Sequence, residues 1–136
     1  RFTAEELQEM EDLVAAVGRS QGFGAWEEQH QRFHILLLTH AGERMLLSVK
    51  QWAEHTERYR RVYVHDAGGG WAQGAREHGE LARLCRERDA AGAACLLGRH
   101  LSRAALTLIA AMDPTHDPVL LRAAVRQVTA AAEQRG

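Results

Sequence analysis

The chain has 136 residues, of which 46% are hydrophobic and 26% charged, proportions that fit one soluble globular domain and exclude a disordered or fibrous chain. Seventeen basic and eighteen acidic residues leave a net charge of -1, whereas a domain that binds DNA by itself usually carries a basic excess. No apolar run is long enough to span a bilayer and two cysteines are too few for a disulfide framework, so we expect no membrane contact and a reducing, cytoplasmic setting.

Helix-forming residues separated by glycines predict three helices in the first half of the chain. Thr3 and Glu6 form a capping-box pattern that opens the first helix, and the glycines that follow it close it. A second helix is predicted over about residues 25–41, ending at Gly42, and a third over about residues 43–65. On the third helix, alternating four- and three-residue steps predict one inward stripe, made of Met45, Val49, Trp52, Thr56, Tyr59 and Tyr63.

Three consecutive glycines at residues 68–70 mark a loop before the remaining helices. A fourth helix is predicted over about residues 71–88, and a fifth begins after Asp89 as its N-cap and continues to about residue 112. Asp117 and Pro118 then open a short tail helix. We therefore predict an all-α, antiparallel bundle of about five to six helices, with one domain over residues 1–112 and a tail helix within residues 113–136.

Two histidines on the second predicted helix have the spacing of a metal chelate. His30 and His34 are four residues apart, which places both imidazoles on one helix face, roughly 6 Å apart at Cβ. By itself the pair is a weak indication, because histidines at this spacing also occur by chance on solvated helix faces.

A second pair is predicted from the hairpin between the fourth and fifth helices. His78 lies ten residues before Arg88 and His100 lies eleven after Asp89, so each stands roughly 15 Å from the turn at 1.5 Å per residue. Both also fall on apolar stripes that are expected to face inward. Together with His30 and His34 they form a candidate four-histidine metal site within the bundle core.

The alternative for each histidine taken singly is a structural role. A buried histidine usually pairs with a carbonyl or carboxylate and binds no metal. Four neutral imidazoles that converge without a metal would, however, be costly to bury. This argument favours metal binding by the four as a unit.

The residues around these histidines resemble a known family. Phe33-His34, preceded by a potential ligand at His30, resembles the (Asp or Asn)-x-x-Phe-His motif of the FadR-type C-terminal domain in GntR-family transcriptional regulators. Its second signature, a Glu-His pair followed 22 residues later by another His, resembles Glu77-His78 and His100. The match extends over roughly residues 5–108 and includes, between and around these motifs, Leu37, Ala41-Gly42, Leu46-Leu47, Leu81, Leu84, Arg88-Asp89, Ala93 and Leu101.

The resemblance implies an all-helical domain that binds a small organic-acid effector, forms a homodimer and contacts operator DNA only through an N-terminal winged helix absent from this chain. In many members, one Asp and three His hold a metal beside the effector. By position, the ligands here would be His30 in the place of the Asp, then His34, His78 and His100.

This sequence departs from the family pattern at three places. His30 replaces the carboxylate, so the predicted site has four neutral imidazoles, which favours zinc, nickel or another late transition metal and leaves the ion's charge free to attract an anion. Glu43 stands where the family usually has Asn. The family's first helix, whose Arg often contacts the effector, is also missing, so we expect the chain to be a fragment of a regulator.

The third helix is expected to supply an effector pocket. Trp52, Thr56 and Tyr59 are the inward residues predicted nearest to the histidines, and two of them offer hydroxyl groups to a carboxylate. Arg60 is the arginine closest to the inward stripe and a candidate carboxylate clamp. Trp52 and Tyr59 fit a plain core role equally well. On the tail helix, Leu121, Val125 and Val128 could serve a dimer contact or pack on their own domain.

Two other functions compete with a metal-dependent sensor. A metalloenzyme needs an open metal position and a general base, but the chain has no HExxH motif and only one ExxH, from Glu27 to His30, and no inward carboxylate is evident. We therefore expect no enzymatic activity. The other alternative is a metal-free helical interaction module.

Overall fold

The computed structural model describes residues 1–66 and 70–133, with side chains placed for residues 1–63 and 72–131. Within these residues the fold is an all-α bundle without strands, as predicted. No helix among them is both long and apolar enough to cross a membrane. The helices are α1 (Ala4–Arg19), α2 (Phe23–Leu37), α3 (Glu43–Asp66), α4 (Gly70–Glu87), α5 (Ala90–Met112) and α6 (Val119–Glu133).

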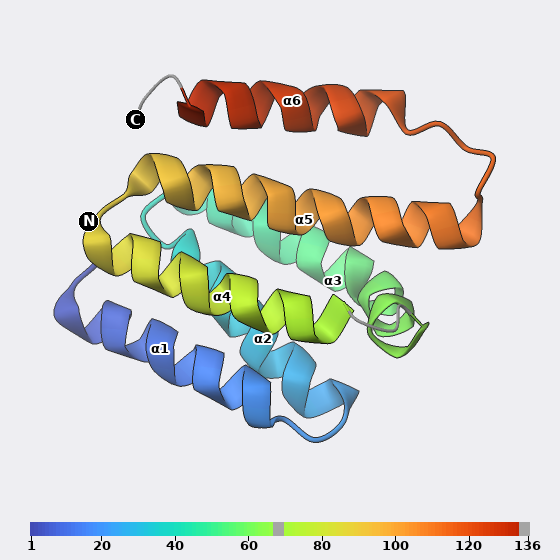
Figure 1. Cartoon of the computed structure of the whole chain (residues 1–136). Coiled ribbons are helices and arrows are strands. Elements are labelled where there is room, and N and C mark those ends of the chain that lie inside the picture. The colour runs from blue at the N-terminus through green and yellow to red at the C-terminus, as the bar shows by residue number, and fades with distance from the viewer. Residues whose placement is uncertain (67–69, 134–136) are drawn as a thin grey trace.

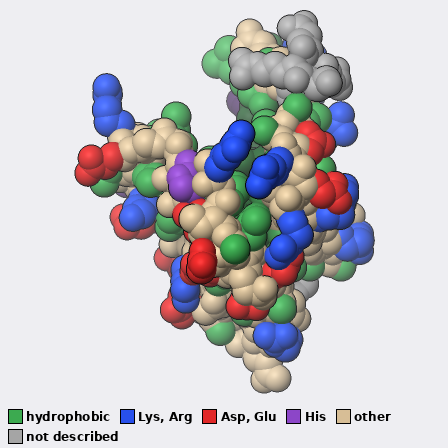
Figure 2. Space-filling model, turned by 90° about the vertical axis from the view of Figure 1, so that its left-hand side faces the viewer, with side chains coloured by type: hydrophobic (Ala, Val, Ile, Leu, Met, Phe, Trp, Pro, Cys, Tyr) green, Lys and Arg blue, Asp and Glu red, His purple; other side chains and the backbone are tan. Residues whose placement is uncertain are grey.

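The helices are arranged as a stack with two further helices behind it (Figure 1). In that view α6, α5, α4 and α1 lie one below another, and each contacts the next. Behind them, α2 packs on α1, and α3 contacts α2, α4 and α5. Basic and acidic side chains are mixed over the face in Figure 2, in keeping with the near-zero net charge.

Local sequence signals set most of the helix ends. The capping box is present: the Thr3 N–H donates to Glu6 at 2.8 Å and the Glu6 N–H donates to Thr3 Oγ1 at 3.2 Å. The Asp89 side chain accepts from the Gly92 N–H at 2.8 Å, and Arg88 turns the chain with a φ of 63°. Both confirm the predicted hairpin between α4 and α5.

The second helix begins close to the predicted start at about residue 25, but its predicted end at about residue 41 is wrong. The helix begins at Phe23 and ends at Leu37, because Leu38 leaves the helical region with φ -108° and ψ 7°. A turn follows, closed by the Ala41 N–H donating to the Leu38 carbonyl at 2.9 Å. Gly42, with a φ of 93°, therefore reverses the chain after the turn rather than ending the helix itself.

The hydrophobic core lies between α1, α2 and α4. Met10, Leu13, Phe33 and Leu81 are at most 4% exposed, and a second cluster, of Val17, Phe23 and Trp26, adjoins the start of α2. This core fixes the α2 and α4 backbones, from which three of the four predicted ligands project.

The first half of α3 lies largely outside this core. Met45 and Trp52 are 53% and 69% exposed, so the predicted inward stripe is wrong at these two positions. Leu46 and Ala53, the next residues along, are the half-buried ones instead. The stripe does face inward farther along the helix, where Thr56, Tyr59 and Tyr63 are partly buried.

The tail helix packs along α5. A Cβ atom added to Gly98 on α5 would lie only 3.1 Å from Cγ1 of Val128, so this glycine permits the close approach of α6. Leu121 and Val125 are half-buried, whereas Leu120 is 86% exposed. Val128 thus packs on its own domain, which is one of the two roles predicted for the apolar residues of the tail helix; the other was a dimer contact.

Candidate metal centre

The four predicted histidine ligands meet in the bundle. His30 and His34 come from α2, His78 from α4 and His100 from α5. Each contributes one ring nitrogen to a group whose members all lie within 4.8 Å of one another. Three helices that are far apart in the chain therefore bring their imidazoles to one point.

The backbone geometry behind this convergence is the one expected from the sequence. The ring centroids of His30 and His34 lie 4.5 Å apart, as expected for side chains one turn apart on the same helix face. The rings of His78 and His100 lie 4.7 Å apart across the α4–α5 hairpin, which confirms that both stand at the same height above the turn. The Trp26 indole also stacks on the His30 ring, with 4.3 Å between the ring centroids, and this contact helps to hold the His30 ring in place.

The distance between the two α2 ligands matches shared coordination. Nε2 of His34 lies 3.1 Å from Nε2 of His30. A zinc–nitrogen bond of about 2.0–2.1 Å places two neighbouring ligand nitrogens roughly 3.0–3.4 Å apart. The pair can thus hold one ion without a change of backbone.

Burial keeps the four imidazoles neutral. His78 is 2% exposed, and burial, with repulsion from His100 and Arg103, lowers its pKa to about 3 against the attraction of Glu77. Burial likewise lowers the pKa of His30, His34 and His100, and repulsion between the histidines adds to the effect in the first two. Neutral imidazole is the form that binds a metal.

Unsatisfied nitrogens test whether the site fits a metal. Among the described residues, Nδ1 of His30 and both ring nitrogens of His78 are buried without a hydrogen-bond partner. A buried polar group in that state is costly, and buried histidines normally have a partner. A metal ion would accept the lone pair that the protein leaves unused at His78, so the donor set and its surroundings fit the ion.

Glu77 orients one of the ligands. Its Oε2 atom lies 2.7 Å from Nδ1 of His100, and Gln73 donates to its other oxygen at 2.8 Å. Although burial opposes ionisation, the hydrogen bonds from Arg103, Gln73 and His100 hold the pKa of Glu77 at about 2. An ionised Glu77 keeps the proton of His100 on Nδ1 and its Nε2 lone pair available, as carboxylates do beside metal-binding histidines.

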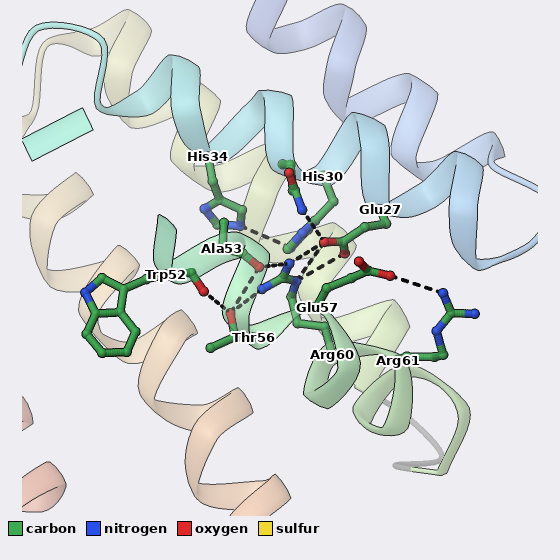
Figure 3. A network of polar contacts seen from close by, with 10 residues as sticks. Glu27, His30, His34, Trp52, Ala53, Thr56, Glu57, Arg60 and Arg61 are labelled. Carbon is green, nitrogen blue, oxygen red and sulfur yellow. Dashed lines mark hydrogen bonds and ion pairs between the residues drawn. The ribbon is translucent and has the colours of Figure 1, made fainter. Parts of the chain in front are cut away.

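A buried ion pair closes the other side of the cluster (Figure 3). Arg60 on α3 donates through Nε to both oxygens of Glu27, at 3.0 and 3.1 Å, and a terminal nitrogen also donates to Oε1. The same guanidinium donates to Thr56 Oγ1 and to the Ala53 carbonyl, each at 2.6 Å. Gln31 donates to Glu27 at 2.6 Å. Arg60 therefore links α3 to α2 one turn before His30.

Glu27 and Glu77 are two largely buried carboxylates beside the histidines, and the sequence interpretation gave neither of them a role. No inward carboxylate was expected, but Glu27 is 7% exposed and the Glu77 side chain 12%. The sequence spacing could have placed each carboxylate near the histidines, because Glu27 lies three residues before His30 and Glu77 directly precedes His78.

A cavity of about 440 Å³ adjoins the histidines on the side away from α1. Three of the expected effector residues, Thr56, Tyr59 and Arg60, line it, whereas Trp52 does not. The Trp52 indole points away from the cluster in Figure 3, and the residue is 69% exposed. The expectation that Trp52 faces the pocket is therefore wrong. The other lining residues are Trp26, His30, Tyr63, Gly74, Ala75, His78, His100, Leu101, Arg103, Ala104, Ala105, Leu108, Ile109 and Met112.

Comparison with known proteins gives one match. A family model described as the FCD domain matches residues 1–103, about three quarters of the chain. No curated protein and no solved structure matches.

Proposed function

The chain belongs to the FCD family, the effector-binding domain at the C-terminus of FadR-type regulators of the GntR family. From this membership we propose that the chain senses a small carboxylate through a bound metal ion. The proposed ligands of the metal are His30, His34, His78 and His100. The observation that carries the proposal is the convergence of four neutral imidazoles, with both nitrogens of His78 left without a partner.

We propose zinc or nickel as the metal. Imidazole nitrogens suit late transition metals, whereas magnesium and manganese prefer oxygen ligands. When bound, the ion supplies a Lewis-acidic positive charge at the cavity wall. His100 would be held for ligation by Glu77, and His30 by its stacking on Trp26.

The charge balance around the cluster favours an anionic effector. The two buried carboxylates each face an arginine, Glu27 with Arg60 and Glu77 with Arg103. These pairs are neutral as units, and the histidines are neutral as well, so nothing in this group offsets the charge of a divalent ion. A carboxylate in the cavity, which Thr56, Tyr59 and Arg60 line, would do so.

The proposed output is a change in DNA binding by a homodimer. Operator DNA would be contacted through a winged-helix domain and not through this helical domain. Ligands from α2, α4 and α5 tie three helices to one point, so an effector there can favour one packing of these helices over another. It shifts that equilibrium only by the difference in its affinity for the two states.

Regulation rather than catalysis also agrees with the state of the inward carboxylates. A general base works best with a pKa near the working pH, whereas that of Glu77 is about 2. Both Glu77 and Glu27 are engaged by arginines. Neither is placed to activate a water molecule.

A thermal-shift experiment tests the proposal. The zinc-loaded chain and the chain stripped with a chelator are each heated with millimolar butanoate, lactate, succinate or citrate. At least one acid should raise the Tm of the loaded chain and leave that of the stripped chain unchanged. The variant Tyr59→Phe, which loses one hydroxyl, should weaken the shift. No shift with any acid, or the same shift without metal, would contradict the proposal.

A further inference from the structure

The cavity beside the histidines has chemically different ends. On α5 its lining begins with His100 and Arg103 and continues with Ala104, Ala105, Leu108, Ile109 and Met112. The latter five carry no polar side-chain atom. From His100 to Met112 the helix rises by roughly 18 Å, at 1.5 Å per residue. The polar groups of the cavity are thus concentrated towards the histidines, and an apolar wall extends away from them.

Small residues on the facing helix leave the space open. Gly74 and Ala75 on α4 line the cavity opposite Ala104 and Ala105. A Cβ atom added to Gly74 would have no atom within 4 Å. The hollow between α4 and α5 therefore lies where each of the two walls carries a pair of adjacent small residues.

The size and lining of the cavity are unsuited to a small polyacid alone. Its volume of about 440 Å³ corresponds to about fifteen water molecules, at roughly 30 Å³ each. A hydrophilic acid that filled this space would place hydroxyl or carboxyl groups against the apolar wall without hydrogen-bond partners, which is unfavourable. An apolar chain in the same place would bury its surface favourably.

We propose that the effector is a monocarboxylic acid with an apolar tail. Its carboxylate lies at the end formed by His30, His78 and His100, and its tail runs along α5 past Ala105 and Leu108. This inference rests on the proposed function, because it identifies the class of acid that the same site takes.

Calorimetric titration of the zinc-loaded chain with butanoate, hexanoate, octanoate and citrate tests the tail. Each fully buried methylene should tighten binding about fourfold, so octanoate should bind roughly 200 times more tightly than butanoate, and more tightly than citrate. Affinity independent of chain length, or citrate as the tightest ligand, would overturn the tail and leave the proposed carboxylate sensor standing. No binding of any acid would overturn both.

A matched pair of variants locates the tail on α5. Ala105→Leu fills the cavity and should weaken octanoate binding at least tenfold while leaving butanoate binding unchanged. Ala110→Leu adds the same side chain at an exposed position of the same helix and should change neither. Gly74→Leu narrows the cavity from the opposite wall and should reproduce the effect of Ala105→Leu. Equal affinities for octanoate in all three variants and the unmodified chain would overturn the placement.

Discussion

Nδ1 of His100 lies 2.7 Å from Oε2 of Glu77, the residue directly before His78. One turn of α4 thus contributes two groups to the cluster: His78, which is one candidate ligand, and Glu77, which fixes the orientation of His100, the candidate ligand on the neighbouring helix. Gln73 and Arg103 hold the carboxylate in turn. Both residues of the adjacent Glu77-His78 pair therefore belong to the site, and Glu77 is not a solvated neighbour of a single ligand.

Replacement of Glu77 tests this orienting role. Glu77→Gln should lower zinc affinity by about 10- to 100-fold, because His100 loses the carboxylate that fixes its tautomer. Glu80→Gln on the same helix is the control, since Glu80 is exposed and pairs only with Arg83 among the contacts described. Competition with a chromophoric chelator measures both affinities. Equal affinities would show that Glu77 does not orient the site.

The buried pair of Glu27 and Arg60 should be important for stability. Arg60→Ala leaves the Glu27 carboxylate, 7% exposed, without its cation and should lower the free energy of unfolding by about 3–5 kcal/mol. Arg32→Ala, which removes the exposed partner of Glu9, should lower it by about 0–1 kcal/mol. Urea unfolding followed by circular dichroism compares the two. Similar losses would mean that the Arg60 pair is no more than a surface contact.

The metal-free chain should lose stability as the pH falls below about 6.5. The folded state holds the histidine pKa values below the ordinary value of 6.5, so in this range the unfolded chain binds more protons than the folded chain. Stability then rises with pH and is lost on acidification towards the folded pKa, about 3 for His78.

Urea unfolding at pH 7.5, 6.5, 5.5 and 5.0 in the presence of a chelator measures this slope. The interval lies above 4.5, the ordinary pKa of a glutamate, below which protonation of Glu77 in the unfolded chain would add to the slope. His78→Gln removes one of the four groups and should flatten the dependence, whereas His116→Gln, at an exposed position, should not. A slope unchanged by His78→Gln would contradict the shifted pKa.

Most of the ligand set could be predicted from the chain because it follows from local geometry. The four-residue step between His30 and His34 and the equal distances of His78 and His100 from the turn at Asp89 depend only on helical rise and one helix break. The ends of α1 and α5 followed from capping residues for the same reason. Such features need no knowledge of how helices cross.

The parts that could not be predicted depend on packing between helices. Arg60 meets Glu27 across 33 residues, and only the crossing of α3 over α2 brings them together. Trp52 lies on the predicted stripe but is 69% exposed, whereas the next residue, Ala53, is half-buried. Periodicity predicts that a helix has an inward face, but the packing of the neighbouring helices decides which residues form it.

Elemental analysis of the purified chain tests the four-histidine site most directly. The account predicts about one zinc or nickel ion per chain, retained by a control with His55→Ala and His116→Ala, which are both exposed, and lost in His34→Ala with His78→Ala. Circular dichroism verifies that each variant is helical. The absence of metal from the unmodified chain, even after reconstitution with zinc or nickel, or equal retention by both double variants, would contradict the account.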